Sequence, residues 1–106
     1  MHDYVDIVKK IVLKKIDLLE FDIFLFGSRA DGTAREMSDI DVGVLGKQKL
    51  NMFTKSDLEQ MLEDCIVPFK VDLIDFYSVS DAFKQRAMQH VVYWNKAKNM
   101  HSVNPT

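Results

Sequence analysis

Two aspartates with one residue between them are the first candidates for chemistry. Asp39 and Asp41 open the apolar segment DIDVGVL, residues 39–45. In an extended strand, residues i and i+2 share a face with Cα atoms roughly 6–7 Å apart. Two such carboxylates can bind one divalent ion or bridge a pair of ions about 4 Å apart, and hard oxygen ligands suit magnesium or manganese. The alternative is a strand with a solvated outer face, which explains most isolated Asp-x-Asp pairs.

A third carboxylate stands among apolar residues. Asp72 lies within Val-Asp-Leu-Ile, which we expect to be part of a buried strand. Burying a carboxylate without a partner is costly, so this residue needs a shared metal, an arginine or backbone donors. Asp75 follows three residues later and is expected on the opposite face. We therefore prefer Asp72 as the third site residue.

Gly27 and Ser28 end the apolar segment FDIFLF. A strand that stops at Gly-Ser and leads into a helix presents free backbone N–H groups and the positive end of the helix dipole, which favour an anion. Glycine has no Cβ, so a phosphate can approach the backbone. Taken alone, Gly-Ser is a common turn. Arg29 follows directly, and it either reaches a phosphate or pairs with a nearby carboxylate, Asp31 or Glu36; both interpretations stay open.

The elements that position these residues follow from periodicity and capping signals. Their order, α-β-α-β-α-β-α-(β), indicates an α/β or α+β domain in which helices flank a small sheet. The expected elements are a helix over 4–19, a strand over 21–26, a short helix or turn over 28–34, a strand over 39–45, a helix N-capped by Thr54 or Ser56 and ending before Pro68, a strand over 69–77, a helix over 80–89 and a short strand over 90–94.

Length and composition set further limits. The 106 residues predict one domain over residues 1–95 and a flexible tail over 96–106. A net charge of −2 gives no sign of binding to nucleic acid or to anionic membranes. The single cysteine, Cys65, excludes an internal disulfide and is expected to be a buried structural thiol. Neither a signal peptide nor a membrane span of roughly 20 apolar residues is visible, which favours a cytoplasmic setting.

Several further side chains give no site signal. The histidines His2, His90 and His101 are scattered and have no partner at ligand spacing, and we expect His2 and His101 to be exposed. Tyr93 and Trp94 close the last apolar segment, where a role in the core or in an interface is expected rather than base stacking.

The segment FLFGSRADGTAREMSDIDV, followed later by VDL, resembles the minimal nucleotidyltransferase family of the DNA polymerase β-like superfamily. The pattern is an apolar strand, Gly-Ser, a spacer of about ten residues, Asp-apolar-Asp and a later carboxylate between apolar residues. The resemblance covers roughly residues 4–94 and implies a small mixed sheet flanked by helices. It also implies that Gly27 and Ser28 bind the β- and γ-phosphates, while Asp39, Asp41 and Asp72 bind Mg²⁺, or Mn²⁺, and complete the catalytic site.

The resemblance also implies a reaction and a partner. The reaction is transfer of AMP from ATP to a hydroxyl, with a tyrosine of a small helical HEPN-type toxin as the acceptor and this chain as the antitoxin. The alternative is a binding module that neutralises its partner by occlusion alone. Modification of RNA or of a small molecule is disfavoured, because no acceptor-binding domain is visible and the chain is acidic. Self-association stays open.

One position departs from the family pattern. Relatives commonly read Gly-Ser-Arg-Ala-Arg-Gly here, whereas this chain has Asp31 in place of the second arginine. An acidic residue near the phosphates weakens the local positive field. The three aspartates are intact, so the change does not predict loss of activity.

Overall fold

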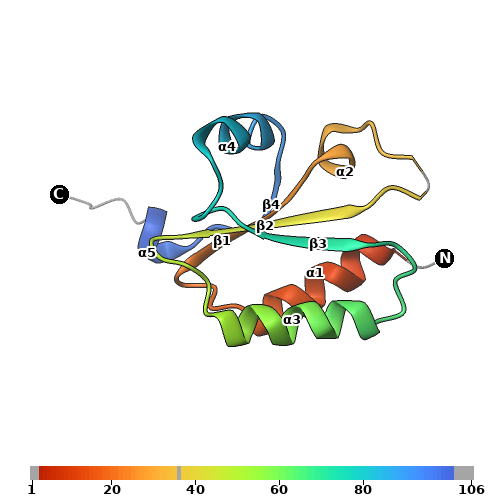
Figure 1. Cartoon of the computed structure of the whole chain (residues 1–106), viewed down its shortest axis with the longest axis horizontal. Helices are drawn as coiled ribbons and strands as arrows, with labels where there is room; N and C mark the ends of the chain where they lie inside the picture. Colours follow the sequence, from red (N-terminus) through yellow and green to blue (C-terminus); the bar gives the residue numbers. More distant parts are fainter. Residues whose placement is uncertain (1–2, 36, 102–106) are drawn as a thin grey trace.

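A four-stranded sheet forms the centre of the molecule (Figure 1). The computed structural model describes residues 3–35 and 37–101. The strand order is β3-β2-β1-β4, in which β1 pairs antiparallel with β2 and β4, and β2 pairs parallel with β3. The elements are α1 (Tyr4–Lys15), β1 (Phe21–Phe26), α2 (Ser28–Asp31), β2 (Ile40–Gly46), α3 (Met52–Asp64), β3 (Val71–Asp75), α4 (Asp81–Ala87), β4 (Val92–Asn95) and α5 (Lys98–His101).

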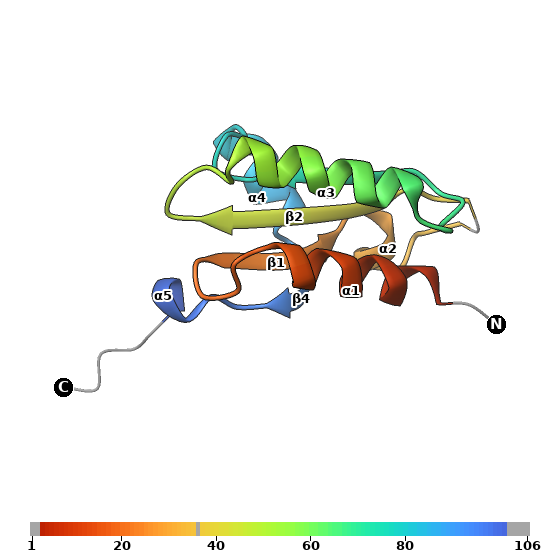
Figure 2. The same cartoon turned by 90° about the horizontal axis from the view of Figure 1, so that it is seen from below.

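The helices cover the two faces of the sheet unequally. The long helices α1 and α3 lie side by side on one face, while the short helices α2 and α4 stand on the other (Figures 1 and 2). On β2, the alternate residues Ile40, Val42 and Val44 are fully buried in the core beneath α1 and α3. This is the face predicted for them, and it leaves Asp41 on the face of α2 and α4.

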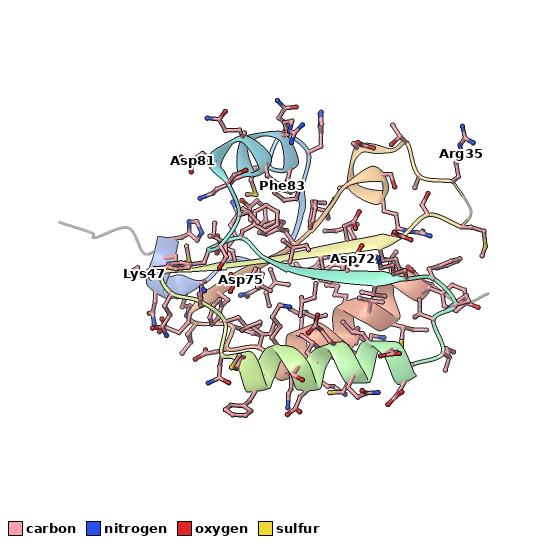
Figure 3. The ribbon with its side chains drawn as sticks, in the orientation of Figure 1. Arg35, Lys47, Asp72, Asp75, Asp81 and Phe83 are labelled. Atoms are coloured by element: carbon pink, nitrogen blue, oxygen red, sulfur yellow. The ribbon has the colours of Figure 1, made fainter. Side chains whose placement is uncertain are left out.

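A smaller aromatic core supports that second face. Phe24 and Phe26 of β1 pack against Phe76, with ring centroids 4.9 and 5.1 Å from the Phe76 ring. Phe83 of α4 closes the cluster at 5.6 Å from Phe76. Figure 3 shows Phe83 between α4 and the sheet. The cluster therefore fixes α4 over the face that carries Asp41.

Two helix boundaries differ from the prediction because local side chains cap the chain earlier. The first helix ends at Lys15 instead of residue 19, since the Asp17 carboxylate accepts the N–H of Leu19 at 2.9 Å and forms a turn. The helix α3 begins at Met52 with Asn51 as its N-cap; the Asn51 side chain accepts two backbone N–H groups. The predicted caps Thr54 and Ser56 are wrong for this reason.

The remaining boundaries shift by one to three residues. Strand β2 starts at Ile40, so Asp39 lies just before it instead of within it. The other differences are β3 over 71–75 instead of 69–77, α4 over 81–87 instead of 80–89, and β4 over 92–95 instead of 90–94.

Cys65 is less buried than expected. It is half-buried at the end of α3, and its thiol donates to the Leu62 carbonyl oxygen at 3.0 Å.

The segment after β4 is ordered into the fold, contrary to the expected flexible tail. Ala97 is fully buried, and its N–H donates to the Asp22 carboxylate at 2.8 Å. His101 of α5 places Nε2 2.7 Å from the same carboxylate, so it has a partner although it is exposed. Asp22 is only 2% exposed and therefore depends on this segment. Residues 102–106, like His2, lie outside the described part of the chain. No helix described here is long and apolar enough to cross a membrane.

Candidate functional site

The turn after β1 requires glycine at its first position. Gly27 has φ 74° and ψ −155°, a backbone conformation that is costly for residues with a Cβ. A Cβ built on Gly27 would also collide with Oδ2 of Asp41. The turn and this carboxylate are thus in direct contact. The predicted phosphate turn and Asp41, one of the predicted metal ligands, therefore lie in contact.

A single helical turn follows the glycine. The Gly27 carbonyl oxygen accepts the N–H groups of Ala30 and Asp31 at 3.0 and 3.1 Å. The N–H groups of Ser28 and Arg29, which precede these two, have no acceptor within such a turn. Ser28 itself is partly exposed, so its hydroxyl is accessible to a ligand.

Asp41 and Asp72 occupy neighbouring positions of the sheet. They are register partners on the parallel strands β2 and β3, which lie roughly 4.8 Å apart in any sheet. Val71 and Leu73 pack against the core of α1 and α3, so the residue between them faces the other way, toward the side of α2 and α4. Figure 3 shows Asp72 on this edge of the sheet. The two carboxylates therefore share a face, as their sequence pattern predicts.

Repulsion within this acidic group is evident from its proton affinity. Burial raises the pKa of Asp41, and the negative charges of Asp72 and Asp39 raise it further, while Lys70 acts in the opposite direction. The Lys70 ammonium lies 3.5 Å from Oδ1 of Asp72 and is largely exposed, so it compensates only part of the charge. A group of carboxylates that disfavours its own ionisation is well suited to a divalent cation.

The three carboxylates are not equally placed for a shared ion. Within residues 3–35 and 37–101, no three acidic, histidine or cysteine side chains are close enough together to hold a metal. Asp41 and Asp72 adjoin each other, whereas Asp39 is exposed and precedes the strand. The donor set nevertheless consists of carboxylate oxygens, the ligands preferred by Mg²⁺ and Mn²⁺. Metal binding by these residues stays a prediction, in which Asp39 has to move toward the other two.

Arg29 makes two contacts that the sequence did not predict. Its Nε and Nη2 donate to the Ser38 carbonyl oxygen at 3.1 and 2.8 Å, and its guanidinium lies 4.8 Å from the centroid of the Phe69 ring. It makes no ion pair with Asp31 in the described structure, and Glu36 is outside the described residues. Arg29 thus ties the glycine turn to the segment that carries Asp39. Phosphate binding by Arg29 stays a prediction.

Two further aspartates have structural roles. The Asp31 carboxylate accepts the hydroxyl of Thr33 at 2.6 Å and its N–H at 3.0 Å, and these bonds, with a smaller contribution from His90, lower the pKa of Asp31. Asp75 accepts the N–H of Leu50 at 2.9 Å, and Leu50 belongs to the core beneath α1 and α3. Asp75 therefore faces away from Asp72, as predicted, and anchors the loop before α3.

The sequence analysis did not predict a pocket beside the glycine turn. Its volume is about 240 Å³, and it lies between the turn and α4. The signal was present in the sequence, because the lining residues of α4 and its C-terminal extension recur at helical spacing, i, i+3, i+4 and i+7. The lining residues are Phe26, Gly27, Asp31, Phe83, Arg86, Ala87 and His90.

Comparison with known sequences identifies relatives. Residues 8–98 match the family model described as polymerase beta, nucleotidyltransferase. The chain is 27% identical over 95 residues to a probable protein adenylyltransferase MntA of Haemophilus influenzae, covering 89% of this chain and 82% of that protein. It is 36% identical over 66 residues to the protein adenylyltransferase MntA of Shewanella oneidensis, covering 62% of this chain and 47% of that protein.

Solved structures with the same fold include toxin–antitoxin complexes. A chain of a toxin–antitoxin crystal structure with AMP-PNP superposes with a TM-score of 0.68 and 28% identity, covering 94% of this chain and 77% of that one. A mutant MntA–HpeT complex gives 0.67 and 29%, with coverage of 93% and 77%. The complex of a tri-AMPylated Shewanella oneidensis HEPN toxin with its MNT antitoxin gives 0.63 and 24%, with coverage of 92% and 77%, a likeness of fold alone.

Proposed function

Because the chain belongs to the polymerase β nucleotidyltransferase family, we propose that it transfers AMP from ATP to a tyrosine hydroxyl of a small helical HEPN-type partner protein. The observation that carries this proposal is the pairing of Asp41 with Asp72 on adjacent strands, with Gly27 in contact with Asp41. A nucleotidyl transfer needs a phosphate-binding turn beside a cluster of carboxylates, and the contact of the glycine turn with Asp41 on one face of the sheet supports this assignment.

The reaction is an in-line displacement at the α-phosphorus. The acceptor oxygen forms a new P–O bond, the bond from the α-phosphorus to the bridging oxygen breaks, and pyrophosphate leaves. Gly27 and Ser28 hold the leaving phosphates. Asp72, on the outer strand β3 beside β2, accepts the proton from the incoming hydroxyl in this proposal. Bound Mg²⁺, held by the three aspartates, would neutralise charge on the phosphates.

The identity of the acceptor rests on the relatives. The MntA of Shewanella oneidensis is named a protein adenylyltransferase and that of Haemophilus influenzae a probable one, and a structure at 28% identity is a toxin–antitoxin complex with an ATP analogue. The net charge of −2 does not favour RNA as an acceptor. A protein acceptor that docks on this chain fits both observations, and it places the chain in the antitoxin role.

The test measures covalent modification of the partner. The chain is purified with the protein encoded beside it, incubated with ATP and MgCl₂, and the mass of the partner is determined. We expect a gain of one or more AMP units. The gain should disappear with EDTA and in Asp39→Ala/Asp41→Ala, and it should persist in the control Asp64→Ala, which removes an exposed carboxylate of α3. A tyrosine-to-phenylalanine change at the modified position of the partner should also abolish it.

The competing explanation is occlusion without chemistry. If the partner gains no mass while the Asp39→Ala/Asp41→Ala double variant still inhibits it fully, the chain is a binding module and the proposed reaction is wrong. Modification at a side chain other than tyrosine would leave the enzyme class intact and correct only the acceptor.

A further inference from the structure

The pocket between the glycine turn and α4 is next to the proposed phosphate site, yet the proposed reaction assigns it no role. Gly27 belongs to both. The aromatic side chains Phe26 and Phe83 form part of the wall, and Figure 3 shows Phe83 turned from α4 toward the sheet. Arg86 and His90 add polar groups to the same wall. The pocket thus combines an apolar base with donors, which is typical of a ligand subsite.

The strand order shows where the pocket lies relative to the proposed site residues. Across the face, Asp72 of β3 is followed by Asp41 of β2, and Asp41 stands opposite Phe26 of β1. Gly27 continues β1, and the pocket begins there. With the acceptor at Asp72 and the leaving phosphates at Gly27, an in-line arrangement extends the triphosphate toward the pocket.

Arg86 is the charged group best able to use this position. Its guanidinium makes no hydrogen bond or ion pair with any described residue, although it lines the same pocket as the Asp31 carboxylate. Asp31 instead binds the Thr33 hydroxyl and N–H. An arginine offers paired N–H donors that match phosphate oxygens. A cation that lines a pocket without a protein partner is available to an anionic ligand.

We propose that Arg86, with His90 beside it, forms a subsite for the terminal phosphate of the nucleoside triphosphate. The inference rests on the proposed function. In this subsite, Arg86 of α4 supplies a positive charge that offsets the negative charge of Asp31 in the segment after the glycine turn. The subsite selects triphosphates over diphosphates, because Arg86 adds a second contact to the γ-phosphate, which a diphosphate lacks, on the side of that phosphate away from Gly27 and Ser28.

The test compares ATP and ADP affinities, measured by titration calorimetry on the full chain with Mg²⁺. The native chain should bind ATP more tightly than ADP. Arg86→Gln should weaken ATP binding about tenfold, the effect expected for loss of one charge-assisted hydrogen bond, and should leave ADP binding unchanged. His90→Asn should weaken ATP binding in the same selective way, but less. Retained ADP affinity also shows that each variant is folded.

A matched control is available on the same helix. Lys84 is a basic residue of α4 that does not line the pocket, so Lys84→Gln removes an equal charge without touching the subsite. It should preserve the preference for ATP. If Arg86→Gln has no effect, or weakens ATP and ADP equally, the subsite is refuted while the transfer reaction stands. If the native chain binds neither nucleotide, both the reaction and the subsite are wrong.

Discussion

At Gly27, backbone geometry and side-chain chemistry compete for the same space. The residue has a positive φ, and any Cβ there would displace the Asp41 carboxylate. Gly32 also has a positive φ, of 85°, but nothing lies within 4 Å of a Cβ built on it. Comparing substitutions at the two glycines therefore distinguishes the effect of backbone strain from the effect of displacing the Asp41 carboxylate.

Gly27→Ala should reduce the transfer rate about 100-fold, since a displacement of about 1 Å at a reacting centre has an effect of that size. Gly32→Ala bears only the backbone strain, about 1–2 kcal/mol of stability, and should keep a nearly native rate. Rates of partner modification and urea unfolding of both variants provide the measurement. Equal rate losses in the two variants would show that strain, and not contact with Asp41, makes glycine necessary.

The raised pKa of Asp41 predicts that this carboxylate opposes folding of the metal-free chain. A carboxyl group whose pKa is higher in the folded state binds protons more tightly there, so stability falls as pH rises from the ordinary aspartate value, about 3.9, through the raised one. Asp41→Asn should therefore raise the melting temperature at pH 7 in EDTA, and the gain should disappear below about pH 3.

The same variant should be inactive in transfer, since it loses a proposed metal ligand. Asp57→Asn is a suitable control, because Asp57 is an exposed residue of α3 outside the acidic group, and its 3.5 Å ion pair with Lys15 lies at the surface, where such pairs contribute little. It should leave the melting temperature nearly unchanged. A melting temperature of Asp41→Asn at or below the native value at pH 7 would contradict the proposed repulsion.

For the helices and strands, the sequence predicts the type of each element better than the residues at which it begins and ends. Apolar alternation over Ile40, Val42 and Val44 correctly predicts the strand and both of its faces. The N-terminus of α3 is mispredicted because Asn51 competes with later Thr and Ser residues for the capping role, and propensity alone does not rank them. The sheet order and the contact of Gly27 with Asp41 depend on long-range pairing that no local pattern contains.

The largest error concerns the C-terminal segment. Residues 96–101 are polar and look unstructured, but Asp22 is a buried carboxylate whose partners, the Ala97 N–H and His101, both come from there. A lone Asp in a predicted buried strand is the signal for this requirement in the sequence, at Asp22 as well as at Asp72. Burial of a charge in one strand thus indicates that a distant segment must satisfy it.

A chain that ends at Asn95 tests this account. It loses both partners of Asp22, and we expect its free energy of unfolding in urea to fall by about 2–3 kcal/mol, because a buried carboxylate is left unpaired. Asp22→Asn should recover part of that loss in the shortened chain, since a neutral amide is less costly to bury. In the full chain, the same substitution should be destabilising. Unchanged stability of the shortened chain would mean that the segment only rests on the surface.

In the whole molecule, the larger hydrophobic core and the candidate site lie on opposite faces of the sheet. The face beneath α1 and α3 holds the larger apolar core, while the face of α2 and α4 holds the carboxylates, the glycine turn and the pocket (Figure 1). We therefore expect substitutions on the first face to act mainly on folding, and those on the second to act mainly on the proposed reaction. With a net charge of −2 over the chain, the surface as a whole offers no general attraction for nucleic acid.

The parallel register of β2 and β3 has a consequence for how a preparation of this protein behaves. A slip of one residue would turn Asp72 into the core and bring Val71 or Leu73 to the surface, so a molecule with this slip lacks the pair of carboxylates. We expect such a molecule to be inactive in the proposed transfer. We therefore expect the specific activity of a preparation to be proportional to the fraction of its molecules in which β2 and β3 are paired in the native register.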